Sequence, residues 1–222
     1  MGGIKNHESI EIIDILRYIQ PALAYNLRVR ACPDRTIQMK RQRSLIDDSI
    51  YSVFITTTII QWIPVFKDMD IAKECLRLFE YYRNELNLSI FAYALLPNHL
   101  HAIIKSSSKG DISVFMRKWK SLSAKSIIDL CQIKHEKWLD EFRNNAVKYK
   151  ITGQFYQVWM PRYDDFAIRN ERELLIKLNY IHSNPLKHNL VEEAMDYPFS
   201  SLKDYMGEQN GFVKIDGGQG KP

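Results

Sequence analysis

The spacing of apolar residues along the chain alternates between the periods of strands and of helices. Short runs rich in β-branched and aromatic residues predict strands over 50–60, 89–96, 99–105 and 154–159. Longer runs with apolar positions at helical spacing predict helices over 70–86, 112–130 and 171–183. A charged connection over 134–150 is expected to contain one more helix.

These elements follow one another as strand, helix, strand, strand, helix, strand, and a last helix. The order predicts an α+β fold in which helices cover one face of an antiparallel sheet. We expect the compact domain over 50–206. Residues 1–49 are expected to form an N-terminal extension with a short amphipathic helix over 8–20 and a basic segment, and residues 207–222 a flexible tail.

The distribution of charge indicates a class of binding partner. The 222-residue chain carries a net charge of +5. Residues 28–43 hold six Arg and Lys residues and one Asp, so this segment alone carries six minus one, or +5. Such a segment is typical of a protein that binds a polyanion such as nucleic acid, or it is a solvated basic linker.

Composition excludes two classes of protein. No apolar run reaches the ~18 residues that a membrane span needs, and the polar N-terminus has no secretory pattern. The cysteines, Cys32, Cys75 and Cys131, are far apart and odd in number, which is typical of reduced thiols. We therefore expect a cytoplasmic protein without a membrane partner.

The first candidate for chemistry is a pair of histidines on the strand over 99–105. Because side chains alternate along a strand, His99 and His101 share one face, while Leu100 and Ala102 point to the other, toward the core. Two imidazoles at this spacing can hold one divalent ion, which would polarise a phosphodiester. A solvated strand face is the alternative interpretation, and a zinc site that lacks a Cys or carboxylate ligand is another.

The second candidate is the helix over 171–183. Asn170 and Glu173 resemble a capping box at its start, and Pro185 is expected to stop it just after Asn184. Its apolar stripe consists of Leu174, Leu178 and Ile181.

Tyr180 lies away from this stripe at 100° per residue, on the side of Glu173 and Lys177. It is either an ordinary surface tyrosine or, beside a metal-bound phosphate, a nucleophile. Asn184 follows four residues later on the same face, where its amide oxygen could be a third, neutral metal ligand.

Four stretches of sequence resemble a known family. They are the strand Tyr51–Thr58, AYALLPNHLHAIIK from Ala92, VWMPRYDDFAIRNERE from Val158 and LNYIHSNPLKHNLVEEAMDYPFSSLKDY from Leu178. The pairing of P-N-H-x-H with a later Y-I-H-x-N-P is the most specific of these features. The chain resembles the single-tyrosine HUH transposases of the IS200-like family, and within them the REP-associated tyrosine transposases.

The resemblance implies a ferredoxin-like sheet with the histidine pair on a central strand. It implies that His99 and His101 bind Mg²⁺ or Mn²⁺ with Asn184 as third ligand, and that Tyr180 forms a 5′-phosphotyrosine intermediate. The implied partner is single-stranded DNA, often beside a small hairpin. The chain departs from the family at Phe166, where His is common, and in its N-terminal extension.

Basic residues are candidates for phosphate contact, and Trp119 among them either stacks on bases or packs in the core. The candidates are Arg41, Arg43, Lys105, Arg117, Lys118, Lys120, Lys125, Arg162, Arg169 and Lys187. Two further functions stay open: a protein that binds hairpin DNA or RNA without chemistry, and a metal phosphodiesterase that uses water. A monomer and a homodimer are both compatible with the sequence.

Overall fold

The computed structural model describes residues 47–148, 155–208 and 211–216. Its strands are β1 (Ser52–Thr58), β2 (Ser89–Leu96), β3 (His99–Lys105) and β4 (Asp164–Ile168). Its helices are α2 (Met69–Glu85), α3 (Asp111–Lys134), α4 (Glu136–Lys148), α5 (Glu171–Lys187) and α6 (Leu202–Tyr205). Short 3-10 turns lie at Ile60–Trp62, Val65–Lys67 and Ala194–Asp196.

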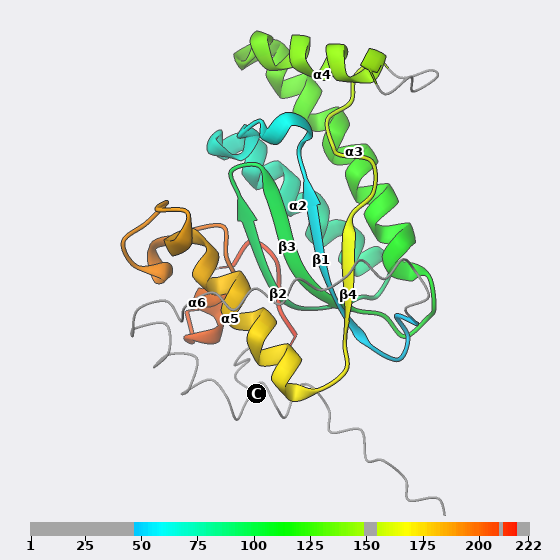
Figure 1. Cartoon of the computed structure of the whole chain (residues 1–222), viewed down its shortest axis with the longest axis vertical. Coiled ribbons are helices and arrows are strands. Elements are labelled where there is room, and N and C mark those ends of the chain that lie inside the picture. Colours follow the sequence, from blue (N-terminus) through cyan, green and yellow to red (C-terminus); the bar gives the residue numbers. More distant parts are fainter. Residues whose placement is uncertain (1–46, 149–154, 209–210, 217–222) are drawn as a thin grey trace, which may run out of the picture.

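The four strands form one sheet in the order β2-β3-β1-β4, and every neighbouring pair is antiparallel (Figure 1). The connection through α2 skips one strand between β1 and β2, and the connection through α3 and α4 skips one between β3 and β4. Crossovers of this kind have one hand, which places α2 and α3 on the same face of the sheet. The α+β, ferredoxin-like prediction is confirmed.

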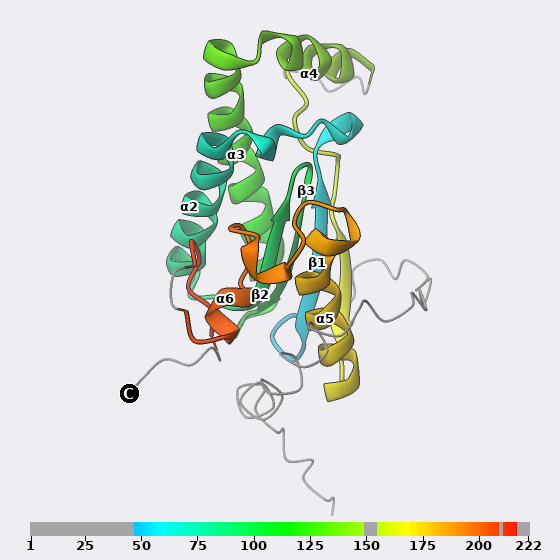
Figure 2. The ribbon, with the colours of Figure 1, turned by 90° about the vertical axis from the view of Figure 1, so that its left-hand side faces the viewer.

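Helices cover both faces of the sheet. Figure 2 shows α2 and α3 on one side and α5 on the other, where α5 packs against β2, β3 and β4. The prediction of helices on a single face was therefore wrong. Both faces of β3 are apolar enough to need cover, because Leu100, Ala102 and Ile103 are all fully buried.

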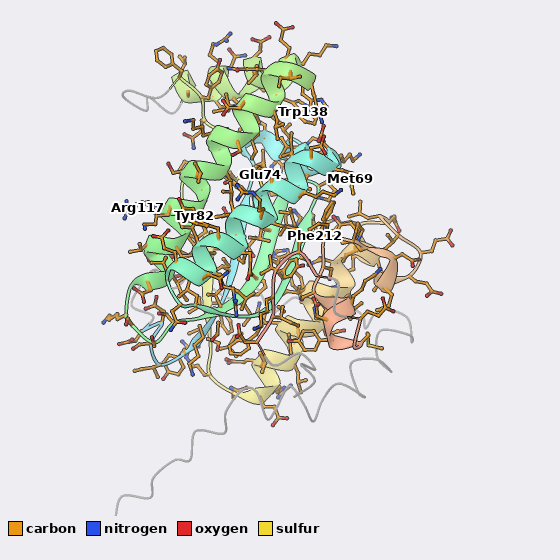
Figure 3. The ribbon with its side chains drawn as sticks, turned by 180° about the vertical axis from the view of Figure 1, so that it is seen from behind. Met69, Glu74, Tyr82, Arg117, Trp138 and Phe212 are labelled. Atoms are coloured by element: carbon orange, nitrogen blue, oxygen red, sulfur yellow. The ribbon has the colours of Figure 1, made fainter. Side chains whose placement is uncertain are left out.

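The face under α2 and α3 holds the aromatic core. Phe79 packs edge-on against Phe115 and Trp119, and the Trp119 indole N–H donates to the Cys75 carbonyl at 2.9 Å. Trp119 is fully buried, so it packs in the core and does not stack on bases. On the outer surface Tyr82 lies along α2, and Arg117 of α3 lies at the edge of the molecule beside it (Figure 3).

The edge strand β4 is displaced from its predicted place at 154–159. Around Trp159 the chain makes only an isolated bridge to Ile59, and Arg162 then adopts a left-handed backbone with φ 91°. The true strand, Asp164–Ile168, begins with two acidic residues, which weaken its apolar signal. Charged residues are common on sheet edges, where they discourage pairing with other chains.

Helix α5 begins where it was predicted to begin, but it ends later than predicted. The Asn170 side chain accepts from the Glu173 N–H, and Glu173 in turn accepts from the Arg169 N–H, so the predicted cap is present. The helix runs through Pro185 to Lys187 instead of stopping after Asn184. Proline removes one backbone donor only, and the His188 N–H still closes the last turn onto the Asn184 carbonyl.

The packed body extends past both predicted domain boundaries. Asp48 is 6% exposed, and its carboxylate accepts from the N–H groups of Gly110 and Ile112 at the start of α3. Val213 is fully buried, and the Asp216 N–H donates to the Ile90 carbonyl along the outer edge of β2. The predicted tail therefore contains a segment that covers an exposed sheet edge.

The predicted helix over 8–20, the basic segment over 28–43 and Cys32 lie outside the described residues. Cys75 and Cys131 are buried free thiols. Within the described ranges no helix is both long and apolar enough to cross a membrane.

Candidate active site

The histidine pair lies on β3, near the middle of the sheet, with both rings on the face that α5 covers. The ring centroids of His99 and His101 are 4.7 Å apart. His101 is 3% exposed and His99 is half-buried. This burial lowers the pKa of His99 to about 4 and that of His101 well below its usual value. Both imidazoles are therefore neutral near neutral pH, the state in which a ring nitrogen can bind a metal. The interpretation as a solvated strand face does not hold for His101.

A neighbouring amide fixes the orientation of the His99 ring. The Asn98 amide nitrogen donates to the Trp62 carbonyl at 3.0 Å, which turns its oxygen toward His99. His99 Nδ1 lies 2.6 Å from that oxygen, so Nδ1 carries the proton and donates. The lone pair is then on His99 Nε2.

The His101 ring is held from the neighbouring strand. Thr56 of β1 is its cross-strand partner, and the Thr56 hydroxyl lies 2.8 Å from His101 Nδ1. His101 Nε2 is buried and has no hydrogen-bond partner among the described residues. With the proton on Nδ1, Nε2 presents a lone pair rather than a buried donor without an acceptor. Such outer hydrogen bonds are how metal-binding histidines are oriented.

Helix α5 places Tyr180 directly against this pair. The Tyr180 ring meets the His101 ring edge-on, with centroids 5.1 Å apart, and meets Phe54 of β1 at 5.9 Å. Tyr180 is half-buried between the helix and the sheet. The interpretation as an ordinary surface tyrosine therefore fails.

Asn184 lies one turn beyond Tyr180, and it is 2% exposed. Its amide nitrogen is buried without a hydrogen-bond partner in the described part of the chain. Buried amides are normally satisfied. The unpartnered N–H group of Asn184 would be satisfied by an acceptor such as a phosphate oxygen, whereas only its amide oxygen can bind a metal ion.

The donor set can be tested against a divalent ion. No cluster of three His, Cys, Asp or Glu side chains that could hold a metal occurs in residues 47–148, 155–208 and 211–216. The set therefore consists of two oriented imidazoles, with Asn184 as the neutral candidate for a third ligand. Mg²⁺ takes oxygen ligands, so two ring nitrogens suit a transition ion such as Mn²⁺ better. The residues fit such an ion, whose remaining ligands would be substrate oxygens and water.

Cationic side chains flank the tyrosine. Lys187 Nζ lies 5.0 Å from the Tyr180 ring centroid, and Lys177 Nζ lies 5.8 Å from it. The ring of His188, just past α5, lies 5.9 Å from that of His99. A phosphate at this site would meet positive charge at both ends of the helix face.

The predicted DNA contacts are spread over the molecule. Arg117, Lys125 and Arg162 line a groove of about 630 Å³ between α3 and the segment 156–163. Lys105 ends β3 six residues from His99, about 20 Å away along the strand. Arg169 is exposed just before α5, and Arg41 and Arg43 lie outside the described residues.

Two of the predicted contacts are already engaged within the fold. The Lys120 ammonium donates to the carbonyls of Met160 and Arg162, and burial lowers its pKa to about 8. Lys118 pairs with Glu85 of α2. A role in DNA binding stays a prediction for all of these residues.

Four residues of the site were not predicted: Thr56, Asn98, Phe54 and Lys177. Asn98 stands next to His99 in the sequence, so its proximity was available there. Lys177 shares the helix face of Tyr180, which helical spacing also indicates. Thr56 and Phe54 reach the site through strand register, which the local pattern does not reveal.

The fold and the site together define a class: α+β proteins with an imidazole pair on a central strand and a tyrosine on the helix that crosses it. Residues 51–184 match the family model for IS200-like transposases. The chain belongs to the IS200-like transposase family.

Individual relatives agree with this family. The REP-associated tyrosine transposase of Escherichia coli (strain K12) is 29% identical over 113 residues, which are 51% of this chain and 53% of the relative. A Haemophilus influenzae protein of the same name is 28% identical over 112 residues, 50% of this chain and 57% of the relative. The aligned region thus spans about half the length of the curated relatives.

A solved structure of a REP-associated tyrosine transposase bound to a REP hairpin has a TM-score of 0.54 to this chain. The match covers 82% of this chain and 95% of the other, at 20% identity. A likeness at this identity shows a shared fold.

Proposed function

We propose that the chain cuts and rejoins single-stranded DNA through a covalent bond to Tyr180, beside a divalent ion held by His99 and His101. The observation that carries this proposal is the edge-on contact of Tyr180 with His101, at 5.1 Å between ring centroids, in a partly buried site. Family membership supports the proposal, and the hairpin in the related solved structure suggests a hairpin-bearing substrate.

The residues divide the work as follows. Thr56 and Asn98 orient the two imidazoles, so that the lone pairs on Nε2 are available for the ion. When bound, the ion would polarise the scissile phosphodiester and lower the cost of ionising a nearby phenol. Asn184 is the candidate for a third ligand. The Lys187 ammonium lies beside the Tyr180 ring, where it can hold a phosphate oxygen.

The proposed reaction forms one P–O bond and breaks another. The Tyr180 phenolic oxygen attacks phosphorus, a P–O bond to Tyr180 forms, and the bond from phosphorus to the 3′ oxygen breaks. The phenolic proton is balanced by the proton that the released 3′-hydroxyl gains. The phosphotyrosine keeps the energy of the broken bond, so a 3′-hydroxyl can later reverse the step and rejoin a strand.

The test is a covalent-adduct assay with labelled single-stranded hairpin DNA and Mn²⁺ or Mg²⁺. Wild-type protein should form an adduct that survives denaturation. Tyr180→Phe should form none, and His99→Ala and His101→Ala should abolish cleavage while the fold persists. Tyr81→Phe is the matched control, because Tyr81 is a helical tyrosine that is 54% exposed on α2.

The alternative functions give different results in the same assay. Cleavage without any trapped adduct would indicate a metal phosphodiesterase that uses water. Salt-dependent binding with no cleavage under either ion would indicate a protein that binds hairpins only. An adduct that persists in Tyr180→Phe would show that the nucleophile lies elsewhere.

A further inference from the structure

Lys177 of α5 occupies an aromatic cage beside the candidate nucleophile. Its ammonium nitrogen lies 4.4 Å from the ring centroid of Phe54, 5.0 Å from that of Phe166 and 5.8 Å from that of Tyr180. Phe54 and Phe166 are cross-strand partners on β1 and β4, so two strands and one helix build the cage. Cation–π contacts hold an ammonium at such distances.

The cage leaves the lysine charge without a counterion. Among the described residues no carboxylate forms an ion pair with Lys177, and no hydrogen bond to its ammonium is present. Burial lowers the pKa of Lys177, and the more distant Glu173 partly opposes this. A half-buried cation of this kind retains most of its capacity to attract an anion.

Lys177 has a defined position relative to the candidate nucleophile and to a candidate metal ligand. Lys177, Tyr180, Asn184 and Lys187 follow at helical spacing and share one face of α5. Phe54, whose ring contacts the Lys177 ammonium, also stacks on the His101 ring with centroids 5.5 Å apart. The ammonium is therefore fixed relative to both the candidate metal ligand and the candidate nucleophile. Lys187, by contrast, is exposed.

We propose that Lys177 is a catalytic residue whose ammonium binds a non-bridging oxygen of the phosphodiester that Tyr180 attacks. This inference rests on the proposed function and assigns a role to a residue that it did not use. During attack the phosphorus gains a bond to the phenolic oxygen before it loses the 3′ oxygen, so negative charge builds on its non-bridging oxygens. A fixed cation beside them stabilises that charge and transfers no proton. The reverse step passes through the same transition state, so the same cation stabilises the charge on the non-bridging oxygens there too.

The test compares neutral and charged replacements in single-turnover adduct formation, with labelled hairpin DNA at saturation and Mn²⁺ present. Lys177→Met and Lys177→Gln should lower the rate by about 100-fold, the loss typical when one preorganised donor is removed from a transition state. Lys177→Arg should recover most of the rate. Lys73→Met, which removes an exposed lysine of α2, should leave the rate unchanged.

Equilibrium binding to the same DNA and thermal unfolding are measured for each variant. A wild-type rate in Lys177→Met would overturn the inference, even though the Tyr180 adduct forms. Equal losses in the Met, Gln and Arg variants, accompanied by a lower Tm, would assign Lys177 to packing and also overturn it. Failure of the wild-type protein to form any adduct would refute the proposed function itself, and this inference with it.

Discussion

The hydrogen bond between Thr56 and His101 offers a direct measure of whether the histidine pair is built to hold a metal. Thr56→Val keeps the shape of the side chain and removes the hydroxyl that lies 2.8 Å from His101 Nδ1. We expect Mn²⁺ binding to weaken by about 10–100-fold, the usual result when the outer partner of a metal-binding histidine is lost. Thr56→Ser, which keeps the hydroxyl, should bind nearly as wild type.

The same magnitude follows from the burial of the ring. His101 is 3% exposed, so without Thr56 the Nδ1–H form leaves a buried donor unsatisfied. That costs about 1–3 kcal/mol, and metal binding must restore this form before Nε2 can coordinate. At about 1.4 kcal/mol for each tenfold change, the penalty corresponds to the expected loss in affinity.

Calorimetric titration of Mn²⁺ into DNA-free protein near neutral pH measures this difference, with urea unfolding to confirm that each variant is folded. Equal Mn²⁺ affinity in wild type and Thr56→Val would refute the reasoning about the tautomer. An absence of Mn²⁺ binding in wild type would refute the metal site.

Two predictions concern the fold around the site. Asp48→Ala should lower the free energy of unfolding in urea by about 2–4 kcal/mol, because a buried carboxylate that accepts from two N–H groups at the N-terminal end of α3 is lost; a change below about 0.5 kcal/mol would show that α3 does not need this cap. Lys120 has a folded-state pKa lowered to about 8, so between about pH 8 and pH 10 the unfolded chain binds more protons there and the contribution of Lys120 to stability should rise with pH. The stability of wild type relative to Lys120→Met should accordingly increase from about pH 7.5 to pH 9.5, and a constant or falling difference would contradict it.

The elements of the fold were predictable where local pattern determines them. The runs that became β2 and β3 have the bounds that their apolar spacing predicted, and the order of elements led to the correct sheet class. The pattern failed at β4, because Asp164 and Asp165 conceal an edge strand, and at Pro185, because a proline in the last turn removes only one hydrogen bond.

The sequence indicated the principal residues of the site, but not how they are arranged in space. Spacing places His99 with His101 on one strand face, and Tyr180 with Asn184 on one helix face. It does not reveal that α5 lies across β3, which is what brings Tyr180 to His101. Thr56 and Phe54 join the site only through the register of β1 against β3. A contact across the sheet depends on strand pairing, which depends on the whole domain.

The buried polar groups bear on whether the site is catalytic or only a relic on a binding protein. His101 Nε2 and the Asn184 amide nitrogen are two of the eight buried side-chain atoms without a partner among the described residues, and they belong to β3 and α5. Each unsatisfied group costs on the order of 1–3 kcal/mol, and an apolar side chain of similar size would remove that cost in one substitution. A protein that only held hairpins would gain stability from either change and lose no function. Both unpartnered groups would instead be satisfied when a metal ion and a substrate phosphate are bound. That is why the nucleophile assay, rather than a binding assay alone, decides between the two functions.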